Sequence, residues 1–408
     1  MDRGGPTGEW LGHERHSPAY RRLLAAMFLA GVATFAQLYS FQPLLPALTQ
    51  TFGVTASGAA LTVSAATLGL AASVIPWSSF ADAVGRVPAM RVSVVAATAL
   101  GLAALLSPRF ELVVAFRLLE GCALGGVPAI AMAYVNEEVH RDHAARASAT
   151  YVAGTSIGGL LGREVSGPVA HLTGQWNVGV GATLALCVAA AVGFTVLVPP
   201  ARGFTPHRAR AGDFVPRGRL LARVAANLRA RGPRLLFIHA FLLMGCFVAM
   251  YNYLGFHLEA APYLLPPTVV DVLFLAYLVG TVGSYLTGGL TERFGRRAVY
   301  LSCLGLFLAG AALTLCGPLW AVVLGLLALT AGFFGAHAVA QGWAVALAPE
   351  GKAQASSLYN LFYYAGSSAL GWLGGWALHA FGWPGVAGMV LLGVGAVLVT
   401  AAGRRLPG

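Results

Sequence analysis

Long apolar runs dominate this chain and most constrain what it can fold into. The sequence of 408 residues is 57% hydrophobic and only 10% charged, whereas soluble domains carry about 25% charged residues. Each run is long enough for a helix to cross a hydrocarbon core about 30 Å thick. The sequence therefore predicts an all-α membrane protein with twelve transmembrane helices, near residues 23–48, 57–80, 90–107, 110–135, 147–170, 177–198, 235–258, 268–290, 298–316, 318–347, 355–380 and 384–402.

The placement of basic residues between these spans predicts the orientation of the chain. The net charge is +11, and most basic residues fall in alternate connections or near the termini, while the opposite connections offer only Arg109. Because positive residues collect on the cytoplasmic side, we expect both termini to be cytoplasmic in a multi-pass protein of the inner (cytoplasmic) membrane. No nucleic-acid partner is needed to explain the charge. The residues on the expected cytoplasmic side include Arg21, Arg22, Arg86, Arg91, Arg141, Arg146, Arg293, Arg296, Arg297, Lys352, Arg404 and Arg405.

A basic connector divides the chain into two similar parts. The pattern S-x-x-x-D-x-x-G-R at 78–86 returns as G-x-x-x-E-x-x-G-R at 288–296. An even number of predicted crossings separates the copies, so we expect two parallel six-helix repeats, an arrangement that suits alternating access. The expected parts are an N-terminal bundle at 1–198 with a cytoplasmic leader at 1–22, a linker at 199–234 with an interfacial helix at 217–229, and a C-terminal bundle at 235–408.

At these repeated loops the sequence resembles the major facilitator superfamily, whose signature G-x-x-x-D-R-x-G-R-R follows helix two and returns after helix eight. The second copy matches with Glu for Asp, and the first departs at Ser78, Ala83 and Val87. The runs YNYLGF, GGLLGR and YNLFYYAGSS are similar to a YnfM-type branch of drug and metabolite proton antiporters. The resemblance covers essentially the whole chain and implies secondary transport by two six-helix halves.

The two signature loops are candidates for a cytoplasmic gate. Glycine at 85 and 295 permits a tight turn with positive φ. We expect Arg86 to pair with Glu137 or Glu138, and Arg296 to pair with Glu350, closing the cytoplasmic side in the outward-open state. The alternative is that these charges only anchor loops among lipid headgroups. The predicted gate residues are Asp82, Gly85, Arg86, Glu138, Glu292, Arg296 and Glu350.

Four ionisable residues stand out inside predicted spans, where each costs about 2.5–3.5 kcal/mol on insertion scales. They are Arg117, Glu120, Arg163 and Glu164, and we interpret them as the proton-coupling group. Arg117 and Glu120-Gly121 resemble the family pattern R-x-x-x-G, whose buried arginine the family implicates in proton coupling. The alternative is a structural pair that neutralises itself, because residues three apart are neighbours on a helix.

Glu164 is the residue expected to carry the proton. It lies about 100° around the helix from Arg163, so it needs another partner, for which Arg117 is a candidate. A desolvated carboxyl near an arginine can bind and release a proton as its access alternates. We therefore expect Glu164→Gln to abolish pH-driven transport without affecting expression.

Span five carries closely spaced glycines, which let helix backbones approach. Gly154, Gly158, Gly159 and Gly162 predict helix packing, and we expect this span to pack against the other half. The run resembles the antiporter motif that ends G-P-x-x-G-G, with Gly159 in place of the proline and Arg163 in place of the last glycine. The repeat counterpart of Arg163 is Gly375, so only the first half carries this arginine.

Polar and aromatic residues on several spans are candidates for the substrate cavity. This chemistry suits amphiphilic or cationic solutes, although aromatic residues near span ends are also ordinary interfacial anchors. The predicted cavity residues are Gln37, Phe41, Tyr251, Asn252, Gln341, Tyr359, Asn360 and Tyr363.

These patterns favour a proton-coupled efflux transporter for a small organic solute or drug. Proton-coupled uptake by symport is the same-class alternative, and a membrane receptor or channel is the alternative of another class. An enzyme is disfavoured because the sequence has no His-Glu-x-x-His run and no P-loop. The cysteines are interpreted as packing residues. We expect no cofactor besides the coupling proton, no metal, and a monomer in the lipid bilayer.

Overall fold

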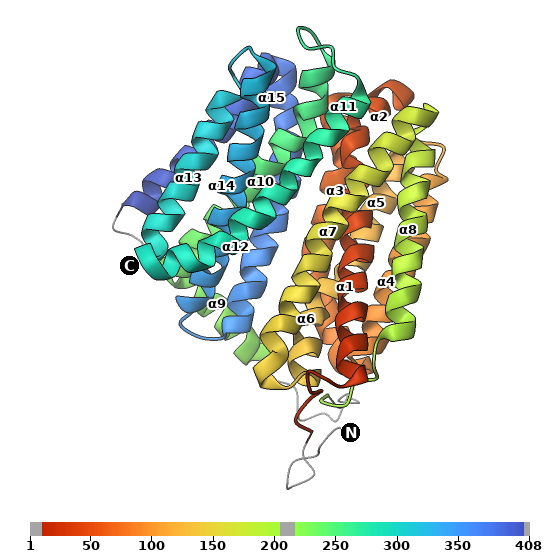
Figure 1. Cartoon of the computed structure of the whole chain (residues 1–408), viewed down its shortest axis with the longest axis vertical. Helices are drawn as coiled ribbons and strands as arrows, with labels where there is room; N and C mark the ends of the chain where they lie inside the picture. The colour runs from red at the N-terminus through yellow and green to blue at the C-terminus, as the bar shows by residue number, and fades with distance from the viewer. Residues whose placement is uncertain (1–9, 205–216, 404–408) are drawn as a thin grey trace. The chain divides into compact units, whose positions relative to one another are not determined.

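The computed structural model describes residues 10–204 and 217–403, and these residues are almost entirely helical (Figure 1). The helices are α1 (Pro18–Tyr39), η1 (Gln42–Leu44, 3₁₀), α2 (Leu45–Phe52), α3 (Ala56–Val84), α4 (Arg86–Leu105), α5 (Phe110–Leu124), α6 (Gly126–Glu138), α7 (Arg141–Thr173), α8 (Trp176–Leu197), α9 (Arg217–Arg229), α10 (Arg231–Glu259), α11 (Pro267–Val272), η2 (Leu273–Leu275, 3₁₀), α12 (Ala276–Phe294), α13 (Arg296–Leu313), α14 (Leu319–Ala346) and α15 (Lys352–Ala402).

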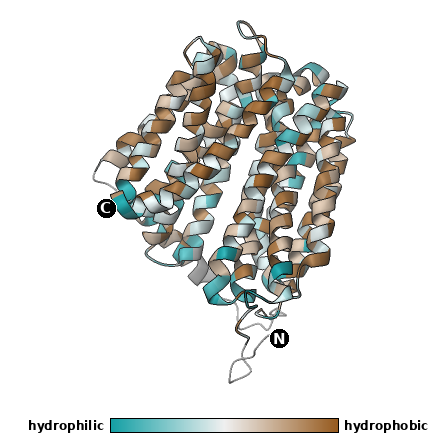
Figure 2. Ribbon diagram, viewed as in Figure 1, coloured by the Kyte–Doolittle hydropathy of each residue, from teal (hydrophilic) through white to brown (hydrophobic). Residues whose placement is uncertain are grey.

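The twelve predicted spans are all present as helix. In the described residues, 10 helical segments are long and apolar enough to cross a membrane. The other two spans are α7, whose hydropathy is lowered by its charged residues and glycines, and the second part of α15. Helix α15 contains a kink at Gly382, with φ 65° and ψ −156°, that separates spans eleven and twelve. Apolar residues cover most of the length of the helices (Figure 2).

The chain divides into two compact units. Unit 1 comprises Met1–Phe41 and Ala72–Asp213, and unit 2 comprises Gln42–Ala71 and Phe214–Gly408. Residues 42–71 thus group with unit 2, whereas the predicted halves were 1–198 and 235–408. In the linker, a helix does span Arg217–Arg229, but its interfacial position stays a prediction. The predicted linker residues 205–216 and the basic residues Arg404 and Arg405 lie outside the described residues.

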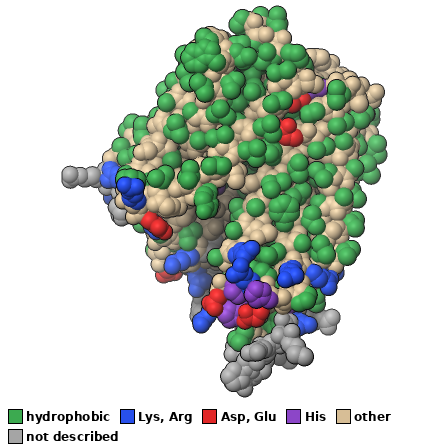
Figure 3. Space-filling view, viewed as in Figure 1, with side chains coloured by type: hydrophobic (Ala, Val, Ile, Leu, Met, Phe, Trp, Pro, Cys, Tyr) green, Lys and Arg blue, Asp and Glu red, His purple; other side chains and the backbone are tan. Residues whose placement is uncertain are grey.

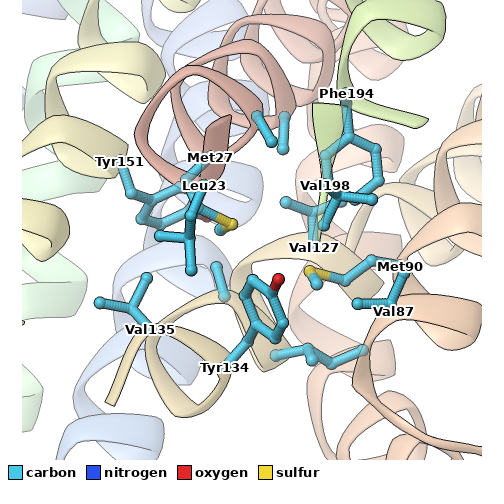
Figure 4. Packing of buried hydrophobic residues seen from close by; sticks show 14 of the residues in the cluster. Leu23, Met27, Val87, Met90, Val127, Tyr134, Val135, Tyr151, Phe194 and Val198 are labelled. Atoms are coloured by element: carbon cyan, nitrogen blue, oxygen red, sulfur yellow. The ribbon is translucent and has the colours of Figure 1, made fainter. Parts of the chain in front are cut away.

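Unit 1 is held together by helices α1, α4, α6, α7 and α8. A cluster of fully buried side chains fills the space between them, including Met27, Met90 and Phe194 (Figure 4). At the edge of this cluster the Tyr134 hydroxyl donates to the carbonyl of Pro199 at 2.7 Å. A buried tyrosine hydroxyl needs such a partner, and the bond fixes the end of α8 to α6.

Glycines bring α7 against α1 within unit 1. A Cβ added at Gly154, Gly158 or Gly162 would lie 2.3, 2.7 or 2.3 Å from backbone atoms of α1. Helices in lipid associate through such close contacts between small residues. The predicted packing role is therefore present for these three glycines, and their neighbour is α1 of the same unit. Packing of span five against the other half stays a prediction. Gly159 lies on another side, near Arg163 and Tyr39.

In unit 2, α10 packs along α15, and α14 packs on α12 and α13. A Cβ at Gly366 of α15 would meet the Phe241 carbonyl oxygen at 2.0 Å, and one at Gly310 of α13 would meet the Leu329 nitrogen at 2.3 Å. Residues 42–71 join this unit through Ser57, whose Cα would lie 2.5 Å from a Cβ at Gly375.

Charged side chains gather at one end of unit 1. Figure 3 shows Lys, Arg and His side chains close to the start of α1, while the visible helical surface above them is mostly hydrophobic. This is the distribution of a chain whose helices cross a bilayer and whose connections meet water.

Candidate transport site

The charged core of unit 1 begins with two residues of α5. Arg117 is 0% exposed and Glu120 is 1% exposed, and Arg117 Nη1 lies 2.7 Å from Glu120 Oε2. Their spacing of three places both on one helix face, as expected from the sequence. The pair therefore neutralises itself inside the unit.

Arg117 also binds the end of α1. Its Nη1 donates to the carbonyl of Gln37 at 3.2 Å and its Nη2 donates to the carbonyl of Leu38 at 2.7 Å. The last carbonyls of a helix have no partner within that helix, and a cation at this end is favoured by the helix dipole. The guanidinium also lies 4.7 Å from the centre of the Phe41 ring. Arg117 thus caps the break at which span one passes from α1 to η1.

A small cavity lies beside Glu120. It has a volume of about 10 Å³, which is room for about one water molecule. A Cβ at Gly101 would lie 2.4 Å from Gln37 Nε2 and 3.1 Å from Glu120 Oε1, so the end of the Gln37 side chain would have to shift to make room for it. The Gln37 amide donates to the Ala97 carbonyl at 2.8 Å. The cavity is lined by Gln37, Ser40, Phe41, Gly101, Glu120, Val180, Thr183 and Leu184.

A second buried arginine lies on the same end of α1. Arg163 of α7 is 1% exposed, donates to the Gly159 carbonyl, and lies 4.1 Å from the centre of the Tyr39 ring. Its neighbour Glu164 is half-buried. Arg117, the partner expected for Glu164, directs its guanidinium at Glu120 and at the end of α1.

Unit 2 carries a cluster of uncharged polar and aromatic side chains. His337 Nδ1 lies 3.1 Å from the Tyr359 hydroxyl, and the rings of His337 and Tyr363 are 4.6 Å apart. Gln341 approaches Asn360 at 3.5 Å, a long contact. Tyr359 is fully buried, whereas the other four side chains are half-buried. The role of Gln341, Asn360 and Tyr363 in a substrate cavity stays a prediction.

Two predicted cavity residues are packed inside unit 2 instead. Tyr251 and Asn252 are each 1% exposed. The Tyr251 hydroxyl lies 2.7 Å from the Thr330 hydroxyl, and Asn252 accepts a hydrogen bond from the Gln42 amide at 2.7 Å. In this conformation both residues serve packing, because each polar group is used within the unit.

The first signature loop contains the expected ion pair. Arg86 binds Glu137 through Nε and Nη2 at 3.0 and 2.9 Å, and Asp82 through Nη1 at 2.6 Å. Such two-point binding of a carboxylate is among the stronger hydrogen-bonded arrangements. Gly85 has φ 102°, so its predicted turn is present, as is that of Gly295 with φ 82°. Glu138, the other candidate, accepts instead from the backbone N–H groups of residues 202 and 203.

The second signature loop differs from the prediction. Arg296, Glu292 and Glu350 are all exposed, and residues 10–204 and 217–403 contain no ion pair between Arg296 and Glu350. The Glu350 carbonyl accepts from the Asn227 amide at 2.7 Å. The expected pair is therefore absent from this conformation, in which solvated side chains gain little from pairing. Its formation in the outward-open state stays a prediction.

Comparison with known proteins settles the family. The model of the Major Facilitator Superfamily matches residues 27–270 and 261–407. The chain belongs to the major facilitator superfamily. The earlier resemblance is thus confirmed, and the chain is a multi-pass membrane transporter of small molecules rather than an enzyme.

Similar proteins of this superfamily match along most of their length. The inner membrane transport protein YnfM of Escherichia coli (strain K12) is 38% identical over 96% of this chain and 92% of its own. The uncharacterized MFS-type transporter YybF of Bacillus subtilis (strain 168) is 37% identical over 92% and 91%. A crystal structure of the peptide transporter POT in complex with sulfate has a TM-score of 0.72 at 16% identity, covering 95% and 96%. That structure supports the fold alone.

Several residues of these sites were not expected from the sequence. Gly101, Tyr39 and Phe204 contact the predicted charges, and His337 joins the predicted tyrosines. For His337 the sequence did contain a signal. It precedes the cavity candidate Gln341 by four residues, which places both on one helix face. Gly101 carried no local signal, because its role depends on side chains from α1 and α5.

Proposed function

We propose that this chain is a proton-coupled secondary transporter that exports a small organic solute by alternating access. The observation that carries the proposal is the set of buried charges around the end of α1, namely Arg117, Glu120 and Arg163. Ionisable groups inside a membrane protein are costly and usually serve an ion or substrate pathway. These charges lie at the break between α1 and η1, so a change in protonation there can alter the conformation of span one.

We assign the exchangeable proton to Glu164 rather than to Glu120. Glu120 is 1% exposed and bonded to Arg117 at 2.7 Å, so its proton exchange requires that pair to open. Glu164 is half-buried, although its Oε1 is buried, so less protein has to move before its carboxylate reaches water. In this proposal Glu120 fixes Arg117, and Glu164 binds and releases the proton as access alternates.

The solute is expected to be amphiphilic and to carry an aromatic or other planar surface. The half-buried side chains His337 and Tyr363 offer aromatic faces, and Gln341 and Asn360 offer amide donors and acceptors. This cluster in unit 2 contains no carboxylate among its described members. Pockets that combine apolar and aromatic walls with a few polar groups select such solutes.

Uptake by symport is the second candidate. The run in α7 departs from the antiporter motif at Gly159 and Arg163. The direction in which the solute moves relative to the proton is therefore decided by experiment. A receptor or channel would leave the duplicated signature loops without a role, and electrical recording with channel-sized currents would support that alternative. The proposed location is the cytoplasmic (inner) membrane, which agrees with the name of the YnfM relative. We further propose that both termini lie inside. We propose a monomer.

The deciding experiment is a proteoliposome assay with an imposed pH gradient and a panel of solutes. Wild type is compared with Glu164→Gln and with the matched control Glu111→Gln, which removes an exposed carboxyl at the start of α5. We expect Glu164→Gln to lose gradient-driven transport but to keep solute exchange without a gradient, and the control to resemble wild type. Retained proton coupling in Glu164→Gln removes the assignment, and solute entering together with protons supports symport.

A further inference from the structure

Glu138, the last residue of α6, holds the chain that follows α8. Its side chain is 0% exposed, and its Oε1 accepts from the backbone N–H groups of Arg202 and Gly203, both at 2.7 Å. The adjacent Glu137 points to Arg86 instead. Two consecutive carboxylates therefore hold two different segments, the signature loop and the start of the linker.

The start of the linker fits closely under the signature loop. A Cβ at Gly203 would lie 2.0 Å from the Glu137 carbonyl oxygen, so only glycine fits without displacement. The Phe204 ring lies 3.9 Å from Arg86 Cζ, a stacking distance for a guanidinium. Just before this segment, the Tyr134 hydroxyl donates to the Pro199 carbonyl at 2.7 Å. Residues 199–204 are thus fixed to α6 at several successive positions.

The segment before α1 also contacts the end of α6. The His13 N–H donates to the Glu138 carbonyl at 2.7 Å, and the His140 N–H donates to the His13 carbonyl at 3.3 Å. The Trp10 indole donates to the Glu137 carbonyl at 3.3 Å, and the Arg202 guanidinium lies 5.4 Å from a Trp10 ring centre. We call this arrangement the cytoplasmic clasp; it consists of Trp10, His13, Glu138, Arg202, Gly203 and Phe204.

The second signature loop has no equivalent clasp in the described residues. Glu350 corresponds to Glu138 in the repeat, but its side chain is exposed, and only its backbone carbonyl is bound, by Asn227. Arg296, the counterpart of Arg86, is also exposed. The two copies of one motif therefore differ in how firmly they are held.

We propose that Glu138 is a positioning residue that, through the clasp, makes the first signature loop a permanent brace within unit 1. The second loop, with Arg296 and Glu350, is then the contact that forms and breaks during transport. Sequence repetition would assign both loops the same role. The distinction rests on the proposed function, because only alternating access requires a contact that changes.

The test is cross-linking between paired cysteines, in a chain whose five native cysteines are replaced. Arg86→Cys with Glu137→Cys probes the first loop, and Arg296→Cys with Glu350→Cys probes the second, each with a short bifunctional thiol reagent. The cross-linking yield is measured in vesicles with and without a pH gradient, and no solute is added. We expect the cysteine pair in the first loop to cross-link in high yield whether or not a pH gradient is present. The cross-linking yield of the pair in the second loop should change with the gradient. A first-loop yield that follows the gradient, or a second-loop yield as constant as the first, overturns the proposal.

A second series tests the clasp in the first-loop cysteine pair. Glu138→Ala and Gly203→Ala are expected to lower the cross-linking yield about tenfold, since each breaks charge-assisted or tightly packed contacts. Glu138→Gln retains the accepting Oε1 and should restore it, and Gly181→Ala, whose Cβ meets its nearest atom at an ordinary 3.7 Å, is the control. An unchanged yield in Glu138→Ala overturns the positioning role. If the proposed function is wrong, wild type will show no proton-driven transport, but the cross-linking yields of this series will still follow the expected order.

Discussion

Arg117 illustrates how one residue serves charge balance and backbone geometry together. It neutralises Glu120 and also binds two carbonyls where α1 ends. The pair with Glu120 was the alternative interpretation of these two residues from the sequence, because it depends only on helical spacing. The contact with α1 depends on where span one breaks, which no local pattern revealed. Arg86 with Glu137 was one of two pairings that the sequence offered, and the structure contains it. Arg296 and Glu350 are exposed, and their pairing stays a prediction.

Removing Glu120 should leave a buried guanidinium without its counter-ion. We expect Glu120→Ala to destabilise the protein by about 3–5 kcal/mol, the usual cost of breaking a buried ion pair. Glu120→Gln should cost less, because its amide oxygen still accepts from Arg117. Thermal unfolding of the detergent-solubilised protein measures this, with Glu111→Ala as the exposed control. Equal stability of Glu120→Ala and the control would argue against a buried pair.

Gly101→Ala should disturb the charged core without touching a charge. The new Cβ would lie 2.4 Å from Gln37 Nε2, so Gln37 must move and the cavity beside Glu120 must fill. Overpacking of this kind costs about 1–3 kcal/mol. We expect a lower unfolding temperature and slower proton-driven transport than in the control Gly181→Ala. Wild-type behaviour of Gly101→Ala would contradict the described placement of Gln37.

At the scale of elements, the spans were easier to predict than their breaks and neighbours. Hydropathy identified twelve crossings because lipid requires about 20 apolar residues per helix. It did not show that Tyr39 ends α1, that Gly125 separates α5 from α6, or that α7 packs on α1. Those features depend on contacts between helices, and glycine spacing indicates close packing without naming the partner.

Gly154 and Gly159, both in α7, should therefore respond differently to substitution by alanine. A Cβ at Gly154 would lie 2.3 Å from the Phe28 carbonyl oxygen. One at Gly159 would come no closer than 3.4 Å, to the end of the Arg163 side chain, and would lie 3.6 Å from the Tyr39 ring. We expect Gly154→Ala to lower stability by about 1–3 kcal/mol more than Gly159→Ala. Unfolding temperatures of the purified variants give the comparison. Equal effects would mean that α7 does not pack on α1 through Gly154.

At the scale of the whole molecule, the two units carry different chemistry despite their shared motif. The described part of unit 1 contains the buried arginines Arg117 and Arg163, and unit 2 contains the aromatic cluster around His337. The repeat analysis anticipated this asymmetry at Arg163, opposite Gly375. It did not anticipate that residues 42–71 would group with unit 2, because their hydrogen bond from Gln42 to Asn252 joins segments far apart in the sequence.

The most direct test of proton-coupled transport is a measurement of proton movement in proteoliposomes when a solute gradient is imposed. A pH-sensitive dye inside the vesicles reports the proton flux. We predict that a transported solute moves protons in the opposite direction in wild type and in Glu111→Gln, and that Glu164→Gln moves solute without protons. Solute transport by wild type with no accompanying proton flux would contradict the account.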